Sequence, residues 1–274
     1  MEDAGGTGGA GGSVGGGAGG GGGGGAAVVD AGVPEKFIFF FEASPSLSVT
    51  DPTASRVVAL QTALSAMPND PNISVAVMAF SGSVTAVLNS PSFEFTPLTQ
   101  WAPADRATMA TRLSNFTFPG SDAGASQRDW IGALSNLYAF LYRDTMRVLT
   151  FGEPLARYTI VFVSDGSPTY NQDDELLCGD VVARLRGLSS SALDVRFHTV
   201  HVFMPSQPVS STCLQDAGVV GGSGCALPTL TLPGVCPILQ IDIDAERLRR
   251  MAARGGGRSL DARTAPVDFA PLFQ

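Results

Sequence analysis

Lysine and long apolar runs are scarce in this sequence. Lys36 is the only lysine, and 25 acidic residues outnumber 17 lysines and arginines, which gives a formal net charge of −8. Proteins that bind nucleic acid usually carry a basic patch. The one basic cluster here, Arg247-Leu248-Arg249-Arg250, is better explained as the exposed face of a helix. No apolar run approaches the roughly 20 residues that cross a bilayer. We therefore expect neither a nucleic-acid partner nor a transmembrane segment.

Familiar catalytic and zinc-binding motifs are also missing. The sequence has no Gly-x-Ser-x-Gly elbow, no phosphate-binding Walker loop and no Cys-x-x-Cys pair. His198 and His201 lie three residues apart in an apolar stretch that we predict to be a strand, so their side chains point to opposite faces. They are better explained as ordinary strand residues than as a ligand pair. We therefore expect a protein that is not an enzyme.

The amino-terminal stretch is dominated by glycine. Residues 1–32 hold 17 of the 33 glycines and almost no large apolar side chain, so we expect a disordered linker there. The remaining stretch, 33–274, has the length of one α/β domain. Met1-Glu2-Asp3 lacks the features of a signal peptide. A glycine-rich tether is nevertheless typical of the region after the modified cysteine of a bacterial lipoprotein. We expect an extracytoplasmic protein, in the cell envelope or secreted, and leave open a lipid anchor outside the given chain.

The four cysteines are Cys178, Cys213, Cys225 and Cys236. The last three fall in a loop-rich stretch, 204–241, which we interpret as an insertion in the domain. An even count in such a segment favours two disulfides, and hence an oxidising compartment, over four free buried thiols. Four cysteines allow three pairings, and the sequence does not choose among them.

Strand and helix patterns alternate through the domain. We predict strands at 37–41, 73–80, 84–88, 158–164, 195–203 and 258–260, and helices at 53–67, 105–116, 129–147, 173–188, 244–254 and 267–273. The turn at 81–83 is so short that the strands it joins must be antiparallel. The continuous apolar run 37–41 is typical of a central parallel strand. The sequence thus predicts a doubly wound α/β fold, with a mostly parallel sheet, one antiparallel edge strand and helices on both faces.

Two of these strands end on an acidic residue. Glu42 follows the first strand and opens the spaced pattern Glu42-x-Ser44-x-Ser46, and Asp165 follows the strand 158–164. Ligands of such folds bind beyond the carboxyl ends of the strands, where the strand order reverses. We therefore expect the two acids at the same edge of the sheet.

The order of elements and the two acids resemble the von Willebrand factor A domain, a fold shared with integrin I domains, over about residues 35–273. That family carries a metal-ion-dependent adhesion site, built from Asp-x-Ser-x-Ser after the first strand, a threonine before the third main helix and an aspartate after the fourth strand. The matching residues here are Glu42, Ser44, Ser46, Arg128 and Asp165. The resemblance implies adhesion through a bridging Mg²⁺ or Mn²⁺, whose one open position takes a carboxylate of a partner protein.

Two of the matching residues depart from the family pattern. Glu42 is one methylene longer than aspartate, and Arg128 stands where threonine belongs. A guanidinium cannot ligate a metal, but it forms bidentate bonds with carboxylates. We therefore expect Arg128 to replace the ion in a salt bridge with Glu42 and Asp165. An alignment shifted by two residues would instead place Ser126 in the threonine role.

The sequence thus favours a tethered, non-enzymatic protein-binding or adhesion module with a degenerate, metal-free site and no cofactor. The rim around Ser44, Ser46 and Asp165, the loop 93–103 and the insertion are its candidate contact surfaces. Two alternatives remain open at this point. One is a structural scaffold domain of a larger assembly, and the other is an adhesin of the same family loaded with Mg²⁺ or Mn²⁺.

Overall fold

One sheet of seven strands organises the molecule. The computed structural model describes residues 32–44, 47–80, 84–86, 96–97, 129–166, 168, 176–203, 237–263 and 266–273. The strands are β1 (Glu35–Glu42), β2 (Ile73–Phe80), β3 (Val84–Ala86), β4 (Thr96–Pro97), β5 (Arg157–Ser164), β6 (Asp194–His201) and β7 (Gly256–Asp261). Their order is β3-β2-β1-β5-β6-β7, and β4 also pairs with β2.

The sheet is mostly parallel, as the sequence predicts. β1, β2, β5, β6 and β7 pair in parallel, whereas β3 and β4 run antiparallel to β2. β4 is a second short antiparallel segment, within a stretch that we expected to be irregular. From β1 the chain adds β2 on one side and later β5 on the other. The strand order therefore reverses between β1 and β5, and ligands of doubly wound folds bind at that point.

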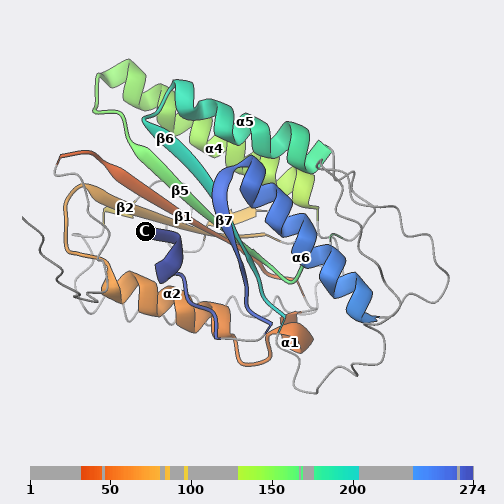
Figure 1. Cartoon of the computed structure of the whole chain (residues 1–274). Helices are drawn as coiled ribbons and strands as arrows, with labels where there is room; N and C mark the ends of the chain where they lie inside the picture. Colours follow the sequence, from red (N-terminus) through yellow and green to blue (C-terminus); the bar gives the residue numbers. More distant parts are fainter. Residues whose placement is uncertain are drawn as a thin grey trace, which may run out of the picture.

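Both faces of the central strand are buried. Ile38 and Phe40 of β1 pack into a core cluster with α4 (Trp130–Phe151), α5 (Val182–Gly187) and α6 (Pro237–Arg254). Phe39 and Phe41 point the other way and pack with α2 (Ser55–Ala66) and the carboxyl-terminal segment 266–273. Figure 1 shows α4, α5 and α6 on one side of the sheet and α2 on the other. This double burial explains why β1 is an unbroken apolar run rather than an alternating one.

Local chemistry sets the limits of α4, the longest helix. Asp129 caps it, since its side chain accepts a hydrogen bond from the Gly132 backbone N–H at 2.9 Å. Gly152, with φ of 69°, ends it in the left-handed conformation that favours glycine. The predicted start is thus confirmed, while the helix runs about one turn further than predicted. Among the described helices, α4 included, none combines the length and apolarity that crossing a membrane requires.

The remaining helical elements are short. They are α1 (Leu47–Thr50), the π-helical turn η2 (Leu176–Val181), and the 3₁₀ turns η3 (Leu188–Ser190) and η5 (Ala270–Phe273). The described part of the predicted helix 173–188 is therefore a π turn that continues into α5. The predicted helix 105–116 lies outside the described residues.

α6 corrects two expectations. It begins at Pro237, inside the stretch 204–241, whereas the predicted helix begins at 244, so Asp244 is an interior helix residue. Asp244 is buried and pairs with Arg247 at 2.7 Å. Arg250 is buried too and pairs with Glu246 at 2.7 Å. Carboxylates three and four residues earlier neutralise these arginines, so of the basic cluster only Arg249 is exposed, and it pairs with Glu246 as well.

Candidate functional site

The carboxyl ends of β1 and β5 lie side by side. Phe41 pairs with Val163 in the sheet register, so Glu42 and Ser164 are the final residues of neighbouring parallel strands. The Ser164 hydroxyl donates a short hydrogen bond to Oε2 of Glu42, and Oγ of Ser164 in turn accepts from the Gly166 backbone N–H at 3.0 Å. Glu42 and Asp165 therefore stand at the same edge of the sheet, at the point where the strand order reverses.

A second hydroxyl holds the other acid. Oγ1 of Thr50, the last residue of α1, donates a hydrogen bond to Oδ2 of Asp165 at 3.2 Å. Ser44 begins the turn into α1, because its carbonyl accepts a hydrogen bond from the Leu47 N–H at 3.2 Å. Neither Thr50 nor Ser164 was identified from the sequence. The sequence offered one weak signal for each residue. Ser164 ends an apolar strand, and Thr50 lies four residues after Ser46.

Several residues of the predicted site lie outside the described residues. These are Ser46, Arg128 and its alternative Ser126, and the cysteines Cys213, Cys225 and Cys236. The salt bridge from Arg128 to Glu42 and Asp165 therefore stays a prediction, and so does any role of Ser46. Cys178 lies buried on η2, and the pairing of the four cysteines stays a prediction as well.

A buried ion pair supports the turn between α1 and α2. Oδ2 of Asp51 lies 2.6 Å from Nη1 of Arg56, and both side chains are almost completely buried. Oδ1 of Asp51 accepts from the backbone N–H and the hydroxyl of Ser55 at 2.7 and 2.6 Å. Ala54, with φ of 53°, turns the chain at this point. This ion pair thus stabilises the turn that directly follows Thr50, whose hydroxyl bonds to Asp165.

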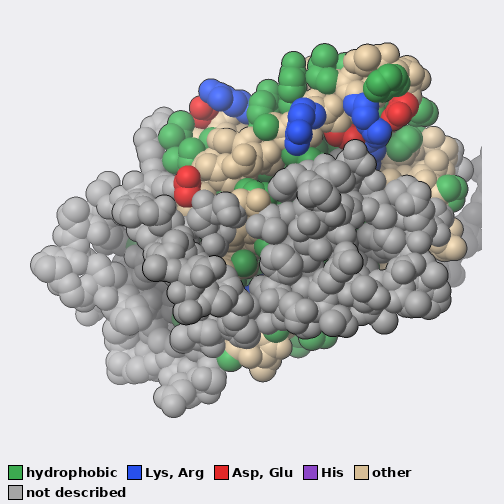
Figure 2. Space-filling view, turned by 180° about the vertical axis from the view of Figure 1, so that it is seen from behind, with side chains coloured by type: hydrophobic (Ala, Val, Ile, Leu, Met, Phe, Trp, Pro, Cys, Tyr) green, Lys and Arg blue, Asp and Glu red, His purple; other side chains and the backbone are tan. Residues whose placement is uncertain are grey.

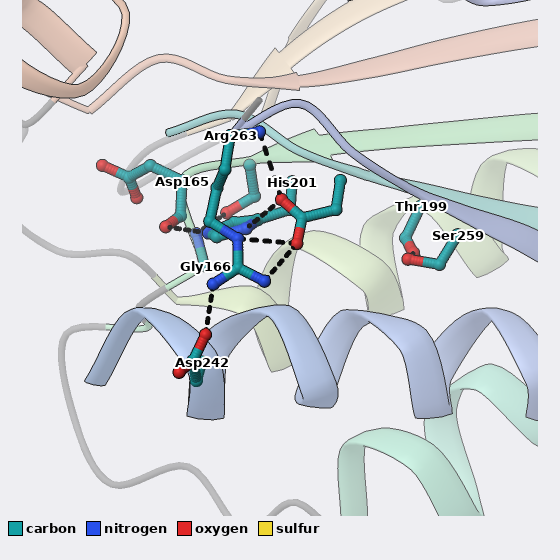
Figure 3. Close-up of polar contacts among 9 residues, drawn as sticks. Asp165, Gly166, Thr199, His201, Asp242, Ser259 and Arg263 are labelled. Carbon is teal, nitrogen blue, oxygen red and sulfur yellow. Dashed lines mark hydrogen bonds and ion pairs between the residues drawn. The ribbon is translucent and has the colours of Figure 1, made fainter. Parts of the chain in front are cut away.

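A polar network ties the Asp165 turn to the last two strands (Figure 3). His201, at the end of β6, has Nε2 3.2 Å from the Asp165 carbonyl oxygen and Nδ1 3.3 Å from Oδ1 of Asp261. Arg263 forms ion pairs with both Asp261 and Asp242, so it joins the end of β7 to α6. Burial by itself would raise the pKa of Asp261, but the bonds from His201 and Arg263 hold it well below its usual range.

Gly166 lets α6 approach this turn closely. Its φ is +103°, and a Cβ added there would collide with Cβ of Asp244 and lie 3.1 Å from Nε2 of His201. Nη1 of Arg247 donates to the Gly166 carbonyl at 3.2 Å and to Asp244 at 2.7 Å. The role of His201 was missed in the sequence, where its position at the end of a strand was the only signal.

The oxygen-bearing side chains at this edge are of types that Mg²⁺ accepts: carboxylates and hydroxyls. Glu42, Ser44 and Asp165 are only 1, 0 and 6% exposed, however, and both acids accept hydrogen bonds from hydroxyls of the protein. In the described part of the chain, no group of three His, Cys, Asp or Glu side chains is placed to hold a metal ion. In this arrangement both acids are held by protein donors.

Comparisons with known proteins concern the fold. No family model and no curated protein matches the chain. Among solved structures it is similar to a von Willebrand factor type A protein from Catenulispora acidiphila, at 12% identity over 88% of this chain and 41% of that one, with a TM-score of 0.49. It is also similar to the pilus adhesin SpaC from Lactobacillus rhamnosus GG, at 9% identity over 89% and 29%, with a TM-score of 0.49. A third is BatB from Bacteroides thetaiotaomicron, at 14% identity over 84% and 91%, with a TM-score of 0.44.

The chain spans less than half the length of the first two of these proteins. The chain's own sheet has the architecture that its resemblance to von Willebrand factor A domains implied: mostly parallel, with antiparallel pairing at one edge and helices on both faces. The fold is therefore of the von Willebrand factor A type.

Proposed function

We propose that this chain is a non-enzymatic protein-binding module that acts through the carboxyl edge of its sheet without a bound metal ion. The observation that carries the proposal is the way its two acids are held. Ser164 donates to Glu42 and Thr50 donates to Asp165, and both carboxylates are buried. The edge would then meet a partner through its rim rather than through a bridging cation.

Charge balance is part of the proposal. Two carboxylates that lie close together repel, and one of them takes up a proton unless a cation is near. We propose that Arg128 supplies this cation, because a guanidinium fork suits two carboxylates and the extra methylene of Glu42 extends its reach. The site would thus carry an internal charge in place of the ion that its sequence pattern suggests.

The surroundings of the domain suit a tethered, extracytoplasmic binder. The glycine-rich stretch 1–32 would act as a flexible linker, and the cysteine-bearing insertion is a second candidate contact surface that two disulfides would stabilise. A lipid anchor outside the given chain is compatible with this arrangement. No catalytic function is proposed, because the polar groups at this edge are buried and engaged with one another.

Binding to cells and to immobilised extracellular matrix proteins tests the proposal, with Mg²⁺ and with EDTA in parallel. We expect binding that survives EDTA. We expect it to weaken in Arg263→Glu, which reverses a charge in the network beside the Asp165 turn, and to persist in Arg184→Glu, which reverses an exposed charge of α5. Thermal melts establish that both variants are folded. Binding that requires Mg²⁺ would contradict the metal-free site. Absence of binding in every condition would contradict adhesion and favour a scaffold domain.

A further inference from the structure

Four arginines gather where β6 and β7 begin, at the amino edge of the sheet. Gly256, the first residue of β7, pairs with the residue of β6 that follows Arg196. Arg254 and Arg258 stand two residues before and after this glycine. A Cβ added at Gly256 would lie 2.7 Å from the guanidinium carbon of Arg186, so that side chain rests against the glycine. The arginine corner is the set Arg186, Arg196, Arg254 and Arg258.

The arginine corner holds more positive charge than its acids balance. Asp194 is shared, since its Oδ1 lies 3.1 Å from Nη1 of Arg186 and its Oδ2 lies 2.7 Å from Nε of Arg196. In the described part of the chain no carboxylate forms an ion pair with Arg254 or Arg258, although Arg258 donates to a backbone carbonyl at 2.9 Å. Four cations against one anion leave a charge of +3, on a chain that carries −8 in total.

Other charges at the amino edge change this balance little. Three cations and three anions form the ion pairs Arg157–Glu35, Lys36–Asp144 and Arg147–Glu153, at 3.3, 2.6 and 3.7 Å. One further cation, Arg143 of α4, and two further anions, Asp70 before β2 and Asp268 before η5, lie outside the corner and bring the sum to +2. The amino edge is therefore positive, whereas the chain as a whole is acidic.

Exposed apolar side chains lie along the same edge. Phe151 ends α4, Leu155 precedes β5 and Leu193 precedes β6, and they are 73, 36 and 49% exposed. The Leu193 N–H donates to the Ala156 carbonyl at 3.0 Å, so the turns before β5 and β6 are neighbours. Leu193 also directly precedes Asp194 of the corner. Figure 2 shows apolar side chains beside charged ones at the end of the molecule where Figure 1 places the carboxyl end of α4.

The chain also enters the domain at this edge. The Arg157 N–H donates to the Pro34 carbonyl at 2.9 Å, directly before β1 begins. β1 and β7 are three positions apart in the strand order, so this entry point lies about 14 Å from the arginine corner. Glu42 ends β1 after eight residues, roughly 23 Å away along the strand. The stretch 1–32 therefore joins the domain on the side opposite the candidate site.

We propose that the arginine corner, with the exposed apolar residues beside it, binds an anionic lipid surface on the side from which the glycine-rich stretch enters. Each arginine near such a surface strengthens binding about fivefold, and salt screens this attraction. Phe and Leu side chains add to it, because they bury in the boundary between headgroups and acyl chains.

The pairing of basic with apolar side chains selects a membrane over other anions. A soluble anion would engage the arginines and leave Phe151, Leu155 and Leu193 in water, whereas a lipid surface takes up both kinds of side chain. The contact is weak by itself, and a tether at the same edge would raise its effective concentration. The contact does not depend on the proposed function, but its consequence does: the carboxyl edge would face away from the membrane, toward a partner.

Co-sedimentation of the full chain with lipid vesicles tests the proposal. Vesicles of phosphatidylcholine with about 40% phosphatidylglycerol are compared with vesicles of phosphatidylcholine alone, at about 20 and 500 mM NaCl. We expect binding to the anionic vesicles to be at least about fivefold stronger at low salt. The difference should vanish at high salt, where the Debye length is only a few ångströms.

Single substitutions separate the two contributions. Arg254→Glu and Arg258→Glu should each weaken binding to anionic vesicles at least about tenfold, whereas Arg143→Glu, the same change of net charge on exposed α4, should weaken it less than about threefold. Leu193→Gln should weaken vesicle binding but leave binding to dextran sulfate, a soluble polyanion, unchanged. Val58→Gln, at an exposed apolar position of α2, is its matched control. Thermal melts establish that each variant is folded.

Several results would overturn the proposal. These are absence of vesicle binding, equal binding to neutral and anionic vesicles, and binding indifferent to Arg254→Glu. Binding to dextran sulfate without binding to anionic vesicles would also overturn it, in favour of a soluble polyanion. Loss of vesicle binding alone, with EDTA-resistant binding to cells or matrix intact, would contradict this inference and leave the proposed function standing. The reverse pattern would contradict the proposed function alone.

Discussion

The Ser164 hydroxyl donates a hydrogen bond to the buried Glu42 carboxylate, and this bond joins the last residues of β5 and β1. It lies where the strand order of the sheet reverses, at the position where proteins of this architecture bind ligands. A protein donor thus holds one oxygen of the Glu42 carboxylate.

Ser164→Ala should lower the free energy of unfolding by roughly 1.5–3 kcal/mol, because it removes a donor from a buried charged acceptor. Chemical denaturation measures this loss. Ser190→Ala is the matched control, since Ser190 is an exposed serine whose hydroxyl donates to the Gly187 carbonyl. A loss for Ser164→Ala no larger than the control would show that the hydrogen bond contributes little.

Arg56→Met should destabilise the chain by about 3–5 kcal/mol, because it strands the buried Asp51 carboxylate. Arg249→Met, which removes an exposed arginine paired with Glu246, should cost no more than about 1 kcal/mol. Adding Asp51→Asn to Arg56→Met should recover part of the loss, and a double-mutant cycle gives the coupling energy. Strictly additive losses would contradict a coupled pair.

Gly166→Ala should cost at least about 2 kcal/mol, since φ of +103° strains any L side chain and the new Cβ collides with Asp244. Gly187→Ala is its control. Gly187 has ordinary helical φ and open space around it, so the change should be neutral or stabilising by up to about 1 kcal/mol. Equal effects of the two substitutions, in thermal or denaturant unfolding, would argue against close packing of α6 on this turn.

His198 should make stability depend on pH. Burial, with Arg196 and Arg258 nearby, lowers the pKa of His198 to about 4. Its ordinary value is about 6.5, so the unfolded chain binds the extra proton first as pH falls. The folded state should therefore lose up to about 3 kcal/mol between pH 6.5 and 4 through this group. His198→Gln should remove this component of the slope. An imidazole that titrates near 6.5 in NMR spectra of the folded chain would refute the expectation.

The sequence predicted the position of the two acids because the apolar strands that carry them end directly before Glu42 and Asp165. It did not predict their partners. Ser164 meets Glu42 only through the register of β1 with β5, and Thr50 meets Asp165 only through the path of α1. Such pairings join residues more than a hundred positions apart and leave no periodic trace in the sequence.

The same limit explains the corrections in α6. An aspartate before a helical pattern resembles a cap, and a run of arginines resembles an exposed face. Asp244 and Arg250 are instead buried, because the pairs Asp244–Arg247 and Glu246–Arg250 neutralise charge within the helix. Spacing alone could have suggested these pairs, but only the packing of α6 against β6 and the Asp165 turn decides which side of the helix is covered.

Isothermal calorimetry of the purified chain with Mn²⁺ and with Mg²⁺ tests the metal-free site most directly. The account predicts no binding at micromolar to low-millimolar metal. It also predicts that Arg128→Thr, which restores the residue type of the family pattern, gains a measurable affinity, most strongly when combined with Glu42→Asp. Micromolar binding of either ion by the unaltered chain, abolished by Asp165→Ala, would contradict it.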